Sequence, residues 1–185
     1  MIVSSLNRSF FKKAIDPLRL FFLRNIFFRK FIFKYFKITN WGLSVFIIRK
    51  VKVSSYTINK IKDTLEQTGF NILHFKILTE KEVKSIANAS GGRKWRKSKP
   101  HILIAAFDNN PIAPINSRAK VLVSFYPDLD NLKLLIKHKI RRIINNDLPL
   151  QKKGKHFHAT DNSYEARQYI DALDSKLLVE LGITK

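Results

Sequence analysis

The stretch SYTINKIKDTLEQTGFNILHFKIL, residues 55–78, decides the fold. Its apolar residues, Ile61 and Leu65 among them, recur near the spacing of an amphipathic helix. Gly69 follows, as at a helix C-terminus. The next run, Asn71–Leu78, is apolar and typical of a strand. We therefore expect a helix that passes directly into a strand.

The same criteria extend the pattern in both directions along the chain. Further strands are predicted over Trp41–Val53, His101–Asp108 and Lys155–Ala159. Further helices are predicted after Thr79, where Thr79 and Glu82 have capping-box spacing, within Tyr126–Asn145, and from an Asn162–Glu165 cap to about Leu181. This order predicts the α+β class, as a ferredoxin-like βαββαβ sandwich that follows an N-terminal basic amphipathic helix.

The composition suits one domain with an appendage. The chain has 185 residues, is 45% hydrophobic, and carries 35 Lys and Arg against 14 Asp and Glu, a net charge of +21. Such a charge favours anionic partners, namely nucleic acid, acidic lipid or phosphorylated small molecules. A compositionally biased genome is a second explanation for part of the lysine excess. The absence of cysteine excludes disulfides, thiolate catalysis and cysteine-based zinc sites.

Residues 1–40 form a segment of their own, in which residues 8–37 hold nine basic residues, one acid and many Phe. Basic residues interrupt every apolar run, which excludes a membrane span and a signal peptide. On a helix, a stripe of basic residues opposes an aromatic one. The membrane or anion contacts expected from these stripes are Lys12, Arg19, Phe21, Phe28, Lys30 and Lys34.

Three interpretations of this segment remain open. It could lie on an anionic membrane surface, with Phe inserted and Lys or Arg on the headgroups. It could instead pack on the domain or on a partner subunit, or serve as an organellar targeting peptide. The first interpretation places the protein in the cytoplasm, peripheral at the membrane.

Three pieces of the remaining chain resemble the nucleoside diphosphate kinase family. They are INKIKDTLEQTGFNILHFKIL, HKIR and HFHATDNSYEA, which occur in the family's order within residues 41–180. The resemblance implies a nucleoside-diphosphate-kinase-like domain over residues 41–185. It further implies a ligand that is a nucleotide or another phosphorylated small molecule, and a homo-oligomer.

The resemblance also implies site residues. His158 falls where the family has its phosphate-accepting histidine, and Arg141 on an arginine that contacts nucleotide phosphates. Lys133 corresponds to a second, upstream arginine. Lys50 is the nearest candidate for a lysine that ends the first strand, with Arg49 and Lys52 close behind. Lys155 stands where the family has Asn and adds a further cation.

Three residues near His158 are expected to support it. Thr160 and Asp161 keep the hydroxyl and the carboxylate of the family signature, whereas Tyr169 replaces the Glu that orients the ring. His156 and His158 lie on the same side of a strand, but no third ligand is evident, so no dedicated metal site is expected. If Mg²⁺ is used, it is expected to arrive on the nucleotide phosphates.

The loop GGRKWRKSKP, residues 91–100, supports an alternative function. Trp95 could stack on a base while Arg93, Lys94 and Arg96 contact phosphates. In the competing interpretation, the loop is solvated and Trp95 closes the core. Two hypotheses therefore remain: a phosphotransferase acting through His158, and a non-catalytic basic module that binds nucleic acid or an anionic membrane.

Overall fold

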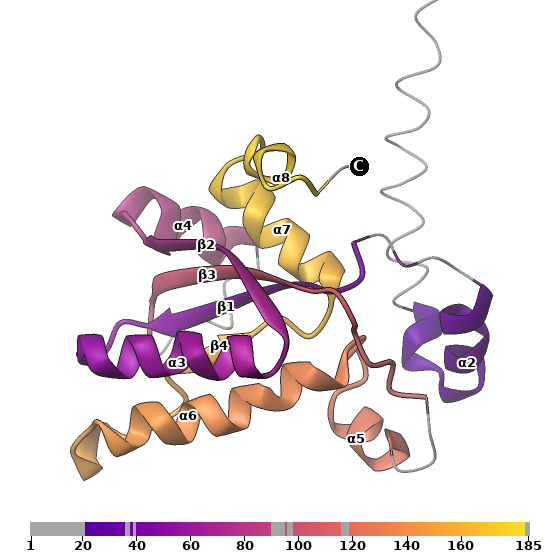
Figure 1. The fold of residues 1–185 in the computed structure, drawn as a ribbon, viewed down its shortest axis with the longest axis horizontal. Coiled ribbons are helices and arrows are strands. Elements are labelled where there is room, and N and C mark those ends of the chain that lie inside the picture. Colours follow the sequence, from indigo (N-terminus) through magenta and orange to yellow (C-terminus); the bar gives the residue numbers. More distant parts are fainter. Residues whose placement is uncertain are drawn as a thin grey trace, which may run out of the picture.

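Four strands form one sheet in the order β2-β3-β1-β4, in which all neighbouring strands are antiparallel (Figure 1). The computed structural model describes residues 21–35, 38, 40–89, 95, 98–115 and 119–183. The strands are β1 (Leu43–Arg49), β2 (Phe70–Ile77), β3 (Pro100–Asp108) and β4 (Phe157–Ala159). The α+β class is thus confirmed.

Helices cover both faces of the sheet (Figure 1). One face carries α3 (Ser55–Gln67) and α6 (Lys137–Asn146), and the other carries α4 (Glu80–Ala89), α7 (Ser163–Leu173) and α8 (Leu177–Glu180). The shorter elements are the 3₁₀ helices η2 (Leu132–Ile136) and η3 (Leu150–Lys152) and the helix α5 (Ala119–Phe125). The helix α2 (Ile26–Tyr35) precedes the sheet in the chain.

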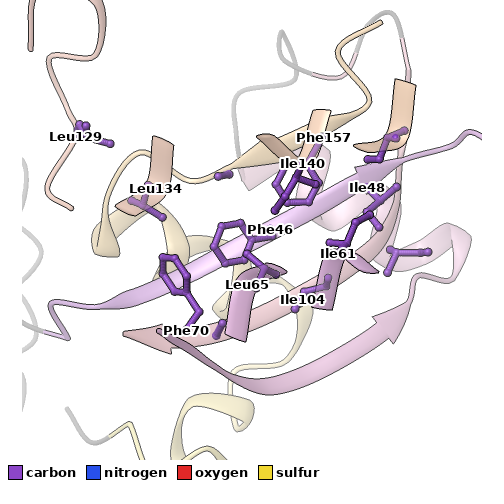
Figure 2. Packing of buried hydrophobic residues seen from close by; sticks show 14 of the residues in the cluster. Phe46, Ile48, Ile61, Leu65, Phe70, Ile104, Leu129, Leu134, Ile140 and Phe157 are labelled. Carbon is purple, nitrogen blue, oxygen red and sulfur yellow. The ribbon is translucent and has the colours of Figure 1, made fainter. Parts of the chain in front are cut away.

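Strand β1 lies in the middle of the core and is buried on both sides. Its side chains alternate, so Phe46 joins the cluster under α3 and α6 while Val45 and Ile47 join the cluster under α4 and α7. Figure 2 shows Phe46 among the rings and aliphatic chains of the first cluster, including Phe70 and Phe157. Because both sides of β1 face an apolar cluster, most of its residues are apolar and they do not alternate with polar ones in a regular pattern.

Local signals in the sequence form as predicted. Gly69 has φ +93° and ends α3 immediately before β2. The Thr79 backbone N–H donates to Glu82 Oε2 over 2.9 Å, which completes the capping box at the start of α4. Asn162 accepts a hydrogen bond from the Glu165 backbone N–H and caps α7.

Several boundaries differ from the prediction. Strand β1 covers only Leu43–Arg49, because the pairing register with β3 shifts after Ile48. The last helix divides at Asp174, whose extended backbone and side-chain bond to the Lys176 N–H end α7 and precede α8. The prediction did not include α5, whose seven residues lie between the strand predicted to end at Asp108 and the helix predicted within Tyr126–Asn145.

A close backbone approach fixes the start of β1. Gly42 has φ +109°, and a Cβ there would lie 2.2 Å from the Asp108 carbonyl oxygen. The Asp108 backbone N–H also donates to the Gly42 carbonyl over 2.9 Å. Only glycine satisfies both the backbone angle and the contact, so Gly42 closes this end of the sheet.

The described part of the N-terminal segment packs on the domain. Arg24 pairs with Asp128 at 2.6 Å, and the buried Arg29 donates to the carbonyls of Pro127 and Leu129. Ile32 of α2 is also buried. In the described part of the chain, no helix combines the length and the apolar character needed to cross a lipid bilayer.

Candidate functional site

The imidazole of His158 lies on the α4 and α7 face of the sheet. Its neighbours in β4, Phe157 and Ala159, point into the other cluster, so strand alternation turns His158 the opposite way. The ring lies edge-on to Trp95 at 5.5 Å and to Tyr169 at 6.1 Å, between ring centroids. The side chain is 14% exposed, so protein atoms enclose most of the ring and leave part of it open.

A carboxylate that the sequence analysis did not assign to the site faces this ring. Glu165 Oε1 lies 3.5 Å from His158 Nε2 and accepts a hydrogen bond from the Tyr169 hydroxyl at 3.2 Å. Glu165 Oε2 accepts from the Asp161 backbone N–H at 2.9 Å, which holds the carboxylate in place. Glu165 precedes Tyr169 by one helical turn, so both side chains share one face of α7.

This arrangement replaces the carboxylate that the resemblance placed at position 169. The Asn162–Glu165 spacing was interpreted as a helix cap, and Asn162 does cap α7. The same spacing also brings Glu165 over the last strand. That signal was in the sequence, but a local capping pattern does not show which strand the helix packs on.

In the part of the chain that the structure describes, one nitrogen of the His158 ring lacks the hydrogen bond that a buried polar atom normally has. Nε2 is buried and forms no hydrogen bond among the described residues, although Glu165 is near. Buried polar atoms are normally paired, and exceptions often mark functional sites. A carboxylate beside Nε2 favours the tautomer with its proton there, which leaves the lone pair on Nδ1.

The cation that joins His158 on this face is Arg49, the last residue of β1. Ile47 pairs with His158, so Arg49 lies two residues further on the same side of the sheet. Its guanidinium lies 4.9 Å from the centre of the Trp95 ring. Burial lowers the pKa of Arg49, as does the charge of Arg141, while Tyr169 raises it.

Lys50 belongs to an adjacent cavity of about 480 Å³. Its polar lining also includes Lys84, Lys99, Glu80 and His101, and its apolar lining includes Leu78, Val83, Ala87 and Trp95. Trp95 is therefore a wall common to this cavity and to the His158 cluster. Trp95 is only 4% exposed. This exposure leaves little of the ring for stacking on a base and agrees with the interpretation in which Trp95 closes the core.

Arg141 comes from α6, which packs on the opposite face, and its side chain reaches the edge of β4. Its Nε donates to the Phe157 carbonyl at 2.9 Å and so secures the outer edge of β4. Burial lowers its pKa, whereas Tyr126 and Asp161 raise it. Lys155 is exposed in the loop before β4. Neither cation has a described contact with the His158 ring.

Two expected supporting residues have structural contacts. Thr160 Oγ1 accepts a hydrogen bond from the Val45 backbone N–H, which continues the pairing of β4 with β1. The Asp161 carboxylate pairs with Lys137 Nζ at 2.7 Å. Both residues thus hold the turn between β4 and α7, on which His158 depends for its position.

Lys133 lies at the other end of the sheet. Its ammonium pairs with Asp108 at 2.8 Å, and Asp108 bonds to Gly42, five residues before Ile47. At strand spacing this separates Lys133 from the level of His158 by about 16 Å. The structure therefore does not bring Lys133 to the histidine.

The remaining predicted residues divide into two groups. Lys12, Arg19, Arg93, Lys94 and Arg96 lie outside the described residues, while Phe21, Phe28, Lys30 and Lys34 are exposed on or beside α2. His156 donates from Nε2 to the Lys152 carbonyl at 2.6 Å. Within the described ranges, no three His, Cys, Asp or Glu side chains are grouped so that they could hold a metal ion.

Comparisons with protein-family models, with curated proteins and with solved structures find no match to this chain.

Proposed function

We propose that this protein is a diverged nucleoside-diphosphate-kinase-like phosphotransferase, in which His158 accepts a phosphoryl group from a nucleotide or another phosphorylated ligand. The observation that carries the proposal is the position of Trp95, which lies between a lysine-rimmed cavity and the ring of His158. A ligand in that cavity would meet Lys50, whereas His158 and Arg49 lie beyond Trp95 and are not among the lining residues, so transfer requires the phosphate end of the ligand to reach past the Trp95 ring.

The topology supports the proposal at the level of the fold. The order β2-β3-β1-β4 with antiparallel neighbours, and with α3 and α6 on one face, agrees with a ferredoxin-like sandwich. The helices α4 and α7 on the second face are additions to that two-layer plan. They are also the elements that enclose the His158 cluster.

The cavity suits a phosphorylated ligand in size and charge. Small-molecule sites commonly enclose about 300–1,000 Å³, and this cavity has about 480 Å³. Lys50, Lys84 and Lys99 provide ammonium groups for phosphate oxygens, and Leu78, Val83 and Ala87 offer apolar surface to a base or a ring. Arg49, beside Trp95, adds a planar donor that can pair two oxygens at once.

The transfer step follows from the tautomer that Glu165 favours. The Nδ1 lone pair of His158 attacks the terminal phosphorus, and the bond from that phosphorus to the bridging oxygen breaks. The nucleoside diphosphate leaves with the electron pair, while the Nε2 proton stays beside the Glu165 carboxylate. An oxygen of the acceptor then takes the phosphoryl group and restores the neutral ring.

Charge in this transition state lies on the phosphoryl oxygens, so nearby cations stabilise it. Arg49 is the described cation placed for that role. Any Mg²⁺ would enter on the nucleotide phosphates, where it would neutralise charge on the leaving group. We extend the proposal to a homo-oligomer only by resemblance to the family.

Incubation with γ-³²P-labelled ATP tests the proposal. We expect label on the wild-type chain that is lost in acid and stable in base, as for phosphohistidine. The label should fall to background in His158→Gln and drop at least about tenfold in Arg49→Gln, because one loses the nucleophile and the other a charge-assisted clamp. His74→Gln, on the far edge strand β2, is the matched control and should label normally.

A full set of nucleoside triphosphates that leaves the wild type unlabelled would refute the transfer step. Binding of a non-hydrolysable ATP analogue, measured by calorimetry, separates binding from transfer. Lys50→Gln should weaken it, and Lys133→Gln should not. Salt-sensitive nucleic-acid binding that is unchanged in His158→Gln, with no nucleotide affinity, would instead favour the non-catalytic basic module.

A further inference from the structure

Exposed apolar side chains gather at one end of the molecule. This end is formed by α2, by the loop after β3 and by α5 (Figure 1). Its exposed large apolar residues are Phe21, Phe28, Phe31, Tyr35, Ile112, Ile115, Val121 and Phe125. In the rest of the described chain, residues of this kind are scattered singly, at Tyr56, Ile77, Leu150 and Val179. A gathered patch of this kind marks an interaction surface, whereas single residues do not.

Contacts hold the parts of this end together. Arg24 and Arg29 join the helix α2 to residues 127–129, which directly follow α5. The loop after β3 joins in through Ile112, whose N–H donates to Asn131 Oδ1 and whose carbonyl accepts from the Leu132 N–H. The aromatic side chains of α2 therefore project from a fixed support.

The exposed side of α2 has two adjacent stripes. Phe28, Phe31 and Tyr35 lie at helical spacing on one stripe, and the rings of Phe31 and Tyr35 lie 4.8 Å apart. Lys30 and Lys34 are exposed next to it, and Lys34 Nζ lies 5.2 Å from the Tyr35 ring. Rings beside flexible cations are typical of helices that lie in a membrane interface.

Charge decides between a lipid surface and a second copy of the chain. Every copy carries a net charge of +21, and residues 8–37 have nine basic residues against one acid. Two such surfaces repel one another, which opposes association of this end with itself. An anionic bilayer attracts each basic residue near its surface and also accepts the rings.

We propose that α2 and α5 form the surface by which this protein lies on an anionic membrane. The rings of Phe28, Phe31, Tyr35 and Phe125 enter the interface, while Lys30 and Lys34 contact acidic headgroups. This proposal is independent of the chemistry at His158, because the two regions share none of the residues that carry them.

Flotation of the full chain with liposomes tests the surface. Vesicles contain either phosphatidylcholine alone or a 70:30 mixture with phosphatidylserine, and the expected result is binding to the mixture only, reduced by salt. Phe28→Ser/Phe31→Ser and Lys30→Glu/Lys34→Glu should each lower the partition coefficient at least about tenfold. Equal recovery with both vesicle types, or none with the mixture, would overturn the proposal.

Matched variants separate this surface from bulk properties. Lys152→Glu/Lys153→Glu makes the same charge change at exposed positions in and beside η3, and Tyr56→Ser removes an exposed ring from α3. Both should bind acidic vesicles within about twofold of the wild type. Equal loss in these controls would mean that net charge alone drives binding, which would overturn a specific surface.

Circular dichroism verifies that each variant is folded. A wild type that self-associates through the Phe28 and Phe31 stripe, without vesicle binding, would assign the surface to a second copy.

Discussion

The Asp108 end and the His158 region of the sheet both hold charged or polar side chains against the core, but only the Asp108 end pairs them fully. The Asp108 carboxylate accepts from Lys133 Nζ and Asn131 Nδ2, each at 2.8 Å. His158 Nε2 is buried 3.5 Å from Glu165 and has no hydrogen bond to any residue that the structure describes. A saturated network stabilises the fold, whereas an incompletely paired one retains groups that can react with a ligand.

The largest loss of stability should come from removing the Asp108 carboxylate, which is fully hydrogen-bonded. Asp108→Ala leaves the Lys133 ammonium and the Asn131 amide without their acceptor, so we expect a loss of about 3 kcal/mol in the free energy of unfolding. Urea denaturation monitored by circular dichroism measures it. The double variant Asp108→Ala/Lys133→Met should recover part of the loss. A change below about 1 kcal/mol in Asp108→Ala would contradict a structural role for this network.

A smaller loss is expected at the neighbouring glycine. Gly42→Ala combines a strained backbone angle with a contact of 2.2 Å to the Asp108 carbonyl, and should cost about 2 kcal/mol. Gly182→Ala is the control, because Gly182 also has positive φ (+69°) but a Cβ there meets no atom within 4 Å. The same urea titrations measure both variants. The amount by which Gly42→Ala loses more free energy of unfolding than Gly182→Ala is the cost of the contact with the Asp108 carbonyl. Equal losses would show that the backbone angle alone matters.

The stability of the fold should depend on pH through the buried carboxyl of Asp130. Burial raises its pKa to about 7, although hydrogen bonds from the Ser163 backbone and hydroxyl and the charge of Arg29 lower it. Because the folded pKa exceeds the ordinary value of 3.8, the protonated carboxyl contributes stability below about pH 4, and this contribution is lost as pH rises to about 7. We expect a decline of about 2 kcal/mol between pH 5 and 7.

Urea titrations of the wild type and of Asp130→Asn at pH 5, 6, 7 and 8 measure this decline. The variant cannot ionise at this position, so its stability should fall less over the same range. Parallel curves for the two proteins would show that other groups cause the pH dependence.

The smallest effect on stability is expected at His158. His158→Phe removes a buried nitrogen that forms no hydrogen bond within the described part of the chain, so the free energy of unfolding should stay within about 1 kcal/mol of the wild type or rise. The same variant should lose all phosphorylation. Tyr169→Phe, which removes the hydroxyl bonded to Glu165, provides a comparison that keeps the histidine. A loss of several kcal/mol in His158→Phe would assign this histidine a mainly structural role.

Local features of the fold could be predicted because neighbouring residues encode them. Gly69, the Thr79–Glu82 capping box and the Asn162 cap act within a few residues of chain, and all three form as expected. The short α5 and the break at Asp174 were missed. A helix as short as α5 is marginal by itself and forms through packing. Packing also decides whether the last helix continues past Asp174.

The site was predictable only in part. Strand alternation turns His158 away from the α3 and α6 face, but the sequence did not show which helices lie opposite. As a result, Lys133 was grouped with His158, although it lies about 16 Å along the sheet. Arg141 comes from a helix on the other face and reaches the edge of β4, where its charge adds to burial in lowering the pKa of Arg49 but where it has no described contact with the His158 ring. Glu165 was overlooked as a member of this cluster, and Arg49 was ranked behind Lys50 as the cation at the end of the first strand.

The sequence by itself determined the α+β class, the antiparallel-compatible order of elements, the strong positive charge and the orientation of His158 on a last strand. Periodicity, capping and charge are properties of single segments, so they can be read without knowing the neighbours. Only the tertiary structure decided that Glu165, Arg49 and Trp95 surround the histidine and that α2 presents its aromatic stripe outward. Those results depend on which side of the sheet each helix packs, and that choice is made by the burial of the whole core.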